Sequence, residues 1–143
     1  MIIKSKRRLL EQLQTMVKRR SRLEAGRLNR NSKIFKIIIK AIQEKKGENI
    51  ISLDLRKIPE AVSDFFIICE ADNPVQIKAI TDNIEEMVKS QAGETPYHRE
   101  GAHGTTWSIL DYINIVVHIM HPDTRKFYKL EEMWNDAGGE NHS

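Results

Sequence analysis

The sequence GTTWSILDYINIVVHIM, residues 104–120, predicts two consecutive strands of a sheet joined by a very short turn. β-Branched and aromatic residues fill 105–111, and 115–120 is a nearly continuous apolar run, so both segments favour extended structure. We expect Asn114 to adopt the left-handed conformation that closes the turn, because asparagine does so at modest cost. The apolar second strand is typical of a strand buried on both faces, which requires helices packed on a sheet.

The first of these two strands has two different faces. Its side chains alternate between them, with Trp107, Ile109 and Asp111 on one face and Ser108, Leu110 and Tyr112 on the other. A Trp, an Asp and a Tyr at this place belong either to the core and the turn or to a recognition surface.

Length and composition predict one domain with an appendage. A chain of 143 residues with 40% hydrophobic residues buries a sizeable core. The single cysteine, Cys69, excludes an internal disulfide and favours a reducing compartment, so cytoplasm is the expected location. No apolar run approaches the roughly 20 residues that span a bilayer, so no membrane association is expected.

Charge is distributed unevenly along the chain. Residues 1–30 hold ten Lys and Arg against two Glu, a net charge of +8, and the remaining 13 basic and 18 acidic residues give −5. The acidic part argues against a globular nucleic-acid binder and favours a basic partner.

The basic extension, residues 1–32, is predicted to be helical or disordered. Leu9, Leu13 and Met16 fall on one narrow stripe of a helix over 5–28, but the narrow stripe and the high charge favour a frayed or disordered extension. Two further alternatives remain open: the arm contacts RNA phosphates, or translation starts at Met16.

The other elements are placed by caps and periodicity. A helix is expected between the N-cap Asn31-Ser32 and a C-cap at Gly47, and a second between Asn73-Pro74 and Gly93. The second helix is expected to bury Val75, Ile77, Ile80, Ile84, Met87 and Val88. Further strands are predicted at 49–55, 64–70 and 96–99, one or two helices within 123–136, and a polar frayed tail at 137–143. Phe127 and Trp134 are expected in the core.

This order predicts an α/β fold, a single domain over residues 33–136 with a mixed, mostly five-stranded sheet flanked by helices.

No catalytic or metal site is predicted. His98, His103, His118 and His121 lack the one-face helical spacing of zinc ligands and are interpreted as core and loop residues. Cys69 follows two isoleucines and is interpreted as an inert small hydrophobe. No Gly-rich phosphate loop is present, so no cofactor is expected.

Ser63-Asp64-Phe65-Phe66 raises the question of a nucleotidyltransferase. Such domains carry Asp-x-Asp on a strand, where paired carboxylates hold Mg²⁺, but this chain has Phe66 at the second position. Asp64 is therefore interpreted as a residue at the start of a strand that caps loop amides, with a partner contact as the alternative.

Taken together, a set of motifs resembles the ribosomal silencing factor family, also called the Iojap family, over residues 33–136. They are Asp54, Ser63-Asp64-Phe65-Phe66-Ile67-Ile68, Glu100-Gly101, Trp107-Ser108-Ile109-Leu110-Asp111-Tyr112, Val116-Val117-His118 and Arg125 to Trp134. The resemblance implies a nucleotidyltransferase-like fold without its catalytic carboxylates.

The resemblance also implies a non-enzymatic function. Family members bind the large ribosomal subunit through a basic ribosomal protein, number fourteen of that subunit, and block joining of the small subunit when nutrients are short. Organellar relatives act in large-subunit assembly, which is the alternative role, and a weak homodimer through surfaces overlapping the docking face is a further implication.

One departure from the family concerns the turn. The family usually reads Asp-Tyr-Gly-Asp there, and this chain has Ile113-Asn114 in place of Gly-Asp. The replacement removes an acidic group and requires either Asn114 or a changed turn to take over the role of the glycine, so contacts of family members at that tip do not transfer directly.

We hypothesise that the docking surface is built from Trp107, Ile109, Asp111, Tyr112, Met120, Arg125 and Tyr128. Trp, Tyr, Met and Arg are enriched in interface centres, and Asp111 is the expected salt-bridge partner of a basic residue. The alternatives are that Trp107 is core, that Tyr112 packs the turn and that Arg125 pairs with Glu131 or Glu132. The rival function from another class is a remnant Mg²⁺-dependent nucleotidyltransferase using Asp64 and one further carboxylate.

Overall fold

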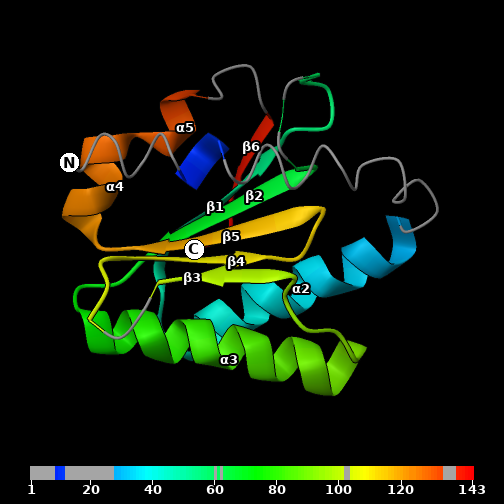
Figure 1. The fold of residues 1–143 in the computed structure, drawn as a ribbon, viewed down its shortest axis with the longest axis horizontal. Coiled ribbons are helices and arrows are strands. Elements are labelled where there is room, and N and C mark those ends of the chain that lie inside the picture. Colours follow the sequence, from blue (N-terminus) through cyan, green and yellow to red (C-terminus); the bar gives the residue numbers. More distant parts are fainter. Residues whose placement is uncertain (1–8, 12–27, 60, 62, 102–103, 134–137) are drawn as a thin grey trace.

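The computed structural model describes residues 9–11, 28–59, 61, 63–101, 104–133 and 138–143. A six-stranded mixed sheet forms its centre, with strand order β3-β4-β5-β2-β1-β6 (Figure 1). The strands are β1 (Glu48–Asp54), β2 (Phe65–Glu70), β3 (His98–Glu100), β4 (Trp107–Asp111), β5 (Ile115–Met120) and β6 (Gly138–Asn141). The helices are α2 (Leu28–Glu44), α3 (Pro74–Ala92), α4 (Pro122–Tyr128) and α5 (Leu130–Met133).

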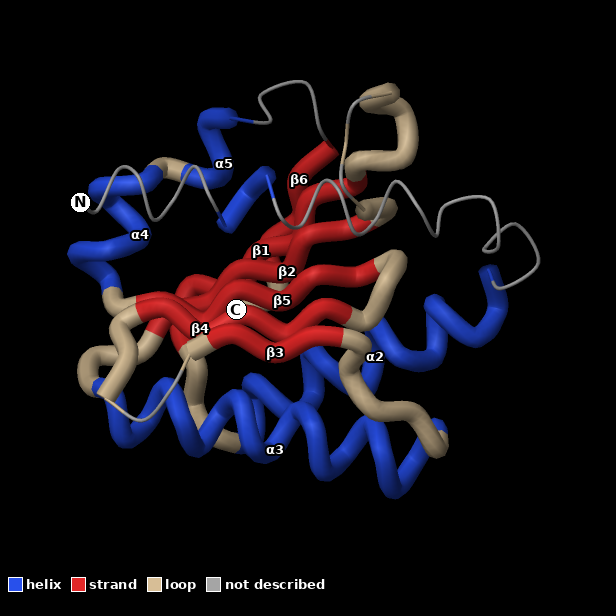
Figure 2. Tube along the Cα trace, in the orientation of Figure 1, coloured by secondary structure: helices blue, strands red, loops and turns tan. Residues whose placement is uncertain are grey.

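Helices cover both faces of this sheet, which confirms the predicted α/β architecture. Helices α2 and α3 pack against one face, and α4, α5 and a helical turn at Leu9–Glu11 lie over the other (Figures 1 and 2). We call the apolar core on the α4/α5 side the upper cluster and the core on the α2/α3 side the lower cluster. The buried residues of the upper cluster are Leu10, Leu53, Leu55, Phe66, Ile68, Ile109, Val116, Met120, Tyr128 and Leu130. The lower cluster includes Ile38, Ile42, Ile67, Ile77, Ile80, Ile84, Leu110, Tyr112, Val117 and Ile119.

The two central strands β2 and β5 run parallel, with Phe66 opposite Val116 and Ile68 opposite His118. Every residue of β5 is buried, as its apolar sequence predicts, because the strand has helices over both faces. Strand β4 pairs antiparallel with β5, and Trp107 lies opposite Met120. The predicted alternation of β4 is confirmed, since Ile109 belongs to the upper cluster and Leu110 to the lower one.

The turn between β4 and β5 differs from the prediction. Its positive φ belongs to Ile113, at 79°, and not to Asn114. The N–H of Asn114 donates to the carbonyl of Tyr112 at 3.0 Å, so the chain reverses within three residues. The positive φ therefore falls at the position where the resemblance leads us to expect glycine, and a β-branched residue is held there at a cost in strain.

Helix α2 also ends differently from the prediction. It starts at Leu28, before the expected cap at Asn31-Ser32, and the left-handed residue after it is Lys46, with φ 61°. The amides of Lys46 and Gly47 donate to the carbonyls of Gln43 and Ile42, which is a Schellman motif. Gly47 is required for packing, since an added Cβ would lie 2.4 Å from Cγ2 of Ile42.

Helix α3 begins and ends as predicted. The Asn73 side chain accepts from the amide of Gln76 at 2.9 Å, Pro74 follows, and Gly93 closes the helix with φ 68°. The buried residues include Ile77, Ile80, Ile84, Met87 and Val88 as expected. The prediction for Val75 was wrong: its side chain is 74% exposed, because it precedes the buried Ile77 by two residues and therefore lies about 200° around the helix from it.

The polar C-terminal segment is not frayed. Residues 138–141 form β6, which pairs antiparallel with β1 and becomes the sixth, edge strand of the sheet. The ring of His142 contacts Phe35 with centroids 5.7 Å apart and hydrogen-bonds the Ser52 hydroxyl at 2.8 Å. Composition alone indicated a tail, because the pairing depends on a distant strand.

The segment after β5 forms the two short helices α4 and α5, as expected. Leu130 is buried, but Phe127 is 59% exposed, so its predicted core position was wrong. Trp134 lies outside the described residues, as does most of the basic extension. At Leu9–Glu11 the extension is helical, and Leu10 is buried in the upper cluster. Among the described residues, none of the helices has the length and apolar character needed to cross a membrane.

Candidate functional site

An aromatic row lies at the end of the sheet where β4 begins and β5 ends. Trp107 is half-buried, and its ring lies 4.9 Å from the ring of Tyr128, centroid to centroid. Phe127 meets Tyr128 edge to face at 5.1 Å and is the most exposed of the three. We call Trp107, Tyr128 and Phe127 the aromatic row. Exposed aromatic side chains on a rigid sheet and helix are typical of a protein-binding surface.

The sequence prediction missed Phe127. Neighbouring residues on a helix point about 100° apart, so Phe127 and Tyr128 do not both face the sheet. Tyr128 is the buried member of the pair, and burial raises the pKa of its hydroxyl. That adjacency was the signal available in the sequence.

Trp107 is held from both its backbone and its ring. Its amide donates to the Thr105 hydroxyl at 3.1 Å, and its indole Nε1–H donates to Nδ1 of His118 at 3.0 Å. His118 is fully buried on β5, and burial lowers its pKa to about 3. The imidazole is therefore neutral at physiological pH.

The other residues of the hypothesised surface occupy different places. Ile109, Asp111 and Met120 are fully buried, and a buried side chain does not reach a partner in this conformation. Asp111 accepts the amide of Ile113 at 2.7 Å and so supports the turn. Tyr112 packs in the lower cluster, on the face of the sheet opposite to Trp107, and burial raises the pKa of its hydroxyl.

Arg125 is a nearly buried cation beside the aromatic row. Its Nη1 donates to the carbonyl of Asn49 at 2.7 Å and to Oε1 of Glu70 at 3.1 Å. The sequence prediction did not foresee Glu70, which lies 55 positions away in the chain. These residues border an open hollow of about 740 Å³ that is also lined by Pro122, Lys126, Lys129 and Glu132.

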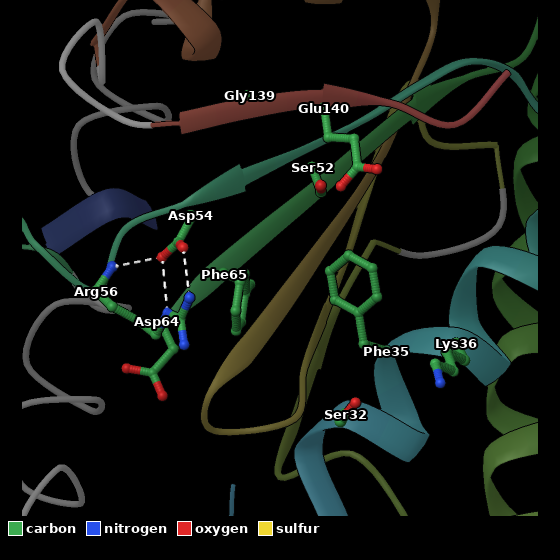
Figure 3. A pocket seen from close by; sticks show the side chains of 10 residues that line it. All are labelled: Ser32, Phe35, Lys36, Ser52, Asp54, Arg56, Asp64, Phe65, Gly139 and Glu140. Atoms are coloured by element: carbon green, nitrogen blue, oxygen red, sulfur yellow. Dashed lines mark hydrogen bonds and ion pairs between the residues drawn. The ribbon is translucent and has the colours of Figure 1, made fainter. Parts of the chain in front are cut away.

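A second hollow, of about 580 Å³, lies at the opposite end of the sheet (Figure 3). Asp54, Asp64 and Glu140 are among its lining residues, and a remnant nucleotidyltransferase would need Asp64 with one further carboxylate here. However, Arg56 occupies both oxygens of Asp54, at 2.9 and 2.7 Å, and holds the pKa of Asp54 below its usual value. Figure 3 shows the Asp64 carboxylate directed away from that pair.

The enzymatic alternative gains no support from these groups. Within the part of the chain that the structure describes, no three His, Cys, Asp or Glu side chains are arranged to hold a metal ion. Phe66 is fully buried in the upper cluster, and burial raises the pKa of Cys69 to about 12, so its thiolate is not available at neutral pH. The described site consists of an exposed aromatic row on a rigid scaffold, which is typical of a binding domain.

Comparison with known proteins identifies the family. The family described as "Ribosomal silencing factor during starvation" matches residues 29–143. The ribosomal silencing factor of Bacillus subtilis is 35% identical over 104 residues, which cover 73% of this chain and 86% of that protein. The one from Halalkalibacterium halodurans is 31% identical over 107 residues, which cover 75% and 90%. This chain belongs to the ribosomal silencing factor family.

Solved structures and organellar relatives agree with this assignment. A crystal structure of a Chromobacterium violaceum protein superposes with a TM-score of 0.68 at 31% identity and covers 73% of this chain and 85% of that one. A mouse protein named "Mitochondrial assembly of ribosomal large subunit protein 1" is 27% identical over 93 residues, which cover 62% of this chain and 41% of that protein.

Proposed function

We propose that this protein is a translational repressor that acts in the cytoplasm. It binds the large ribosomal subunit through a basic ribosomal protein, number fourteen of that subunit, and thereby blocks joining of the small subunit, especially under nutrient limitation. The observation that carries this proposal is membership of the ribosomal silencing factor family over residues 29–143. No chemistry is required, because a domain bound at the subunit interface excludes the other subunit by its bulk.

Charge supports a basic partner for this domain. Residues 31–143 contain 13 basic and 18 acidic side chains, a net charge of −5. Complementary charge increases the rate of association and disfavours wrong partners.

The aromatic row is the surface through which we propose that the domain contacts its ribosomal partner. Phe127 and the half-buried Trp107 supply the accessible apolar area, and Arg125 lies on the same helix as Phe127, at the rim of the hollow. Ile109, Met120 and Tyr128 form the packed base beneath, whereas Asp111 and Tyr112 hold the turn at the far end of β4. A few aromatic side chains at the centre of an interface carry most of its binding energy.

Sedimentation with purified ribosomal subunits tests this proposal. The protein is mixed with large subunits, small subunits and joined ribosomes in Mg²⁺ buffer, and we expect it to pellet with large subunits and to reduce joining. Trp107→Ala is expected to weaken binding at least tenfold and Phe127→Ala severalfold. Val75→Ala is the matched control, because Val75 is an exposed apolar residue on α3, which packs against the opposite face of the sheet. This variant should bind large subunits as tightly as wild type.

Failure to bind either subunit across a range of salt would remove the ribosome from the proposal. Near-wild-type binding by folded Trp107→Ala and Phe127→Ala variants would instead remove only the aromatic row. Sedimentation of the protein alone reports whether a weak homodimer forms, and a dimer that competes with large subunits would place its interface at the same face.

The basic extension supplies a second contact in this proposal, with phosphates of ribosomal RNA. Ten of its first 30 residues are Lys or Arg, and the family match begins only at residue 29. Phosphate contacts release counterions, so the affinity should fall steeply with salt. Deletion of residues 1–27 should flatten that salt dependence; an unchanged slope would contradict the RNA contact.

Assembly of the large subunit is the alternative role, and the name of the mouse relative favours it. The two roles differ in cells that lack the protein. Loss of an assembly factor leaves precursor particles of the large subunit, whereas loss of a repressor leaves mature subunits and raises translation in starved cells.

A further inference from the structure

His118 is an unusual residue for its position. It lies in the middle of β5, between valine and isoleucine residues, and its side chain is fully buried in an apolar environment. Phe66 lies against it with ring centroids 4.7 Å apart. Its Nε2 atom is buried and has no hydrogen-bond partner among the residues that the structure describes. Burying an unsatisfied polar group is unfavourable, and a leucine or phenylalanine would avoid that cost.

The hydrogen bond with Trp107 determines the tautomer of this histidine. An indole Nε1–H only donates, so Nδ1 of His118 accepts and carries no proton. In the neutral imidazole the single proton is then on Nε2, the atom for which the described part of the chain offers no acceptor. The polar chemistry of His118 is therefore directed to one group, the indole of Trp107.

This contact has a direct consequence for the exposed surface. Once its N–H is bonded inside the domain, the indole presents apolar ring atoms outward and has no donor to desolvate when a partner covers it. The ring is also fixed in one orientation, between His118 and Tyr128. Fixing a side chain before binding removes its ordering cost from the binding reaction.

We propose that His118 is a positioning residue for docking: through its hydrogen bond to Nε1 it locks the Trp107 indole in the orientation that a protein partner binds. This inference rests on the proposed function. The preorganisation of one large side chain corresponds to about a two- to tenfold gain in affinity.

Three substitutions at this position separate the hydrogen bond from simple packing. In His118→Asn the amide oxygen lies near the place of Nδ1, whereas in His118→Gln it lies near the place of Nε2, and His118→Leu has no acceptor. We expect His118→Asn to bind large subunits within about twofold of wild type, and His118→Leu and His118→Gln to bind two- to tenfold more weakly. If His118 contributed only by packing, the affinities of the variants would instead follow how closely each replacement matches histidine in size and polarity.

The indole resonance gives a readout that does not depend on the partner. In ¹⁵N-labelled protein the Nε1–H signal of Trp107 is identified by its loss in Trp107→Phe. We expect this signal to move upfield and to exchange faster with solvent in His118→Leu, and to stay close to wild type in His118→Asn.

A double-mutant cycle tests whether His118 acts through Trp107. In a Trp107→Phe background, which keeps an aromatic ring but lacks the donor, His118→Leu should cause no further loss of affinity. The matched control is Thr81→Val on the lower face, where the Thr81 hydroxyl donates to Ser108 at 3.0 Å in an equally buried setting. Thr81→Val should lower stability and leave both the affinity and the indole signal unchanged.

The outcomes distinguish this inference from the proposed function. If the indole signal does not respond to His118→Leu, or if it responds while affinity stays at the wild-type value, the positioning role is wrong and the proposed function stands. An equal loss of affinity from His118→Leu in the Trp107→Phe background would also overturn it. If the wild-type protein does not bind large subunits at all, the proposed function fails and the inference fails with it.

Discussion

The positive φ of Ile113 provides a sharp test of the turn between β4 and β5. We consider the pair of substitutions Ile113→Gly and Ile113→Ala. Ile113 is half-buried, has φ 79° and donates its amide to Asp111 at 2.7 Å. Both variants remove the side chain beyond Cβ, so their packing differs by the Cβ atom alone, and only glycine is free of the steric conflict at positive φ.

The difference between the two variants follows from two opposing terms. A non-glycine residue at positive φ stores roughly 1–3 kcal/mol of backbone strain, which Ile113→Ala retains and Ile113→Gly releases. Glycine in turn costs about 0.5–1 kcal/mol because its unfolded chain is more flexible. Ile113→Gly should therefore be more stable than Ile113→Ala by about 1 kcal/mol. Within an ordinary strand or helix the order is the reverse.

Urea unfolding of the two variants measures this difference. With a slope of roughly 2 kcal/mol per molar urea, the midpoint of Ile113→Gly should lie about 0.5 M above that of Ile113→Ala. Equal midpoints, or a higher midpoint for alanine, would refute the positive φ at this residue. Ile113→Asn should lie between them, because asparagine tolerates the left-handed region better than alanine.

Three further measurements test other parts of the structure. The pKa of His118 is about 3 in the folded state and about 6.5 in the unfolded state, so the unfolded state binds more protons between these two values. The free energy of unfolding is therefore unaffected by His118 well above pH 6.5 and decreases as the pH falls towards 3. Between pH 7 and pH 5 wild type should lose about 2 kcal/mol more than His118→Asn in urea unfolding, and equal losses would contradict a buried neutral imidazole. Arg125→Ala should destabilise the domain by about 3 kcal/mol, because it leaves Glu70 without its partner in a largely buried setting. The control Lys126→Ala removes an exposed side chain and should change stability by less than about 0.5 kcal/mol. Similar values for both variants would show that the Arg125 contacts are dispensable. Gly47→Ala should cost about 2 kcal/mol by overpacking against Ile42, and a neutral result would mean that the end of α2 shifts to accommodate the methyl group.

Local sequence patterns predicted most of the fold. The run 115–120 indicated a strand buried on both faces, and Asn73-Pro74 and Gly93 marked the ends of α3. These signals work because a cap or an apolar period involves residues that are close in the chain. The sixth strand was not predicted, since Gly138-Gly139-Glu140-Asn141 has little strand propensity and forms one only beside β1.

Single positions at the ends of elements were harder to predict. Asparagine and glycine were favoured for left-handed backbone at 114 and 47, but the structure uses Ile113 and Lys46. Propensity describes the cost of a conformation in isolation, and the surrounding strands and helices offset that cost here.

The family, the α/β class and the residue types at the site could be read from the chain alone, because motif order and hydrophobic period are properties of the sequence. Which of those residues are accessible depends on the folded structure. It buries Ile109, Asp111 and Met120, turns Tyr112 to the opposite face, exposes Phe127 and pairs Trp107 with His118. The physical reason is that exposure and hydrogen-bond partners depend on contacts between β4, β5 and α4, which are separate segments of the chain that pack together only in the folded domain.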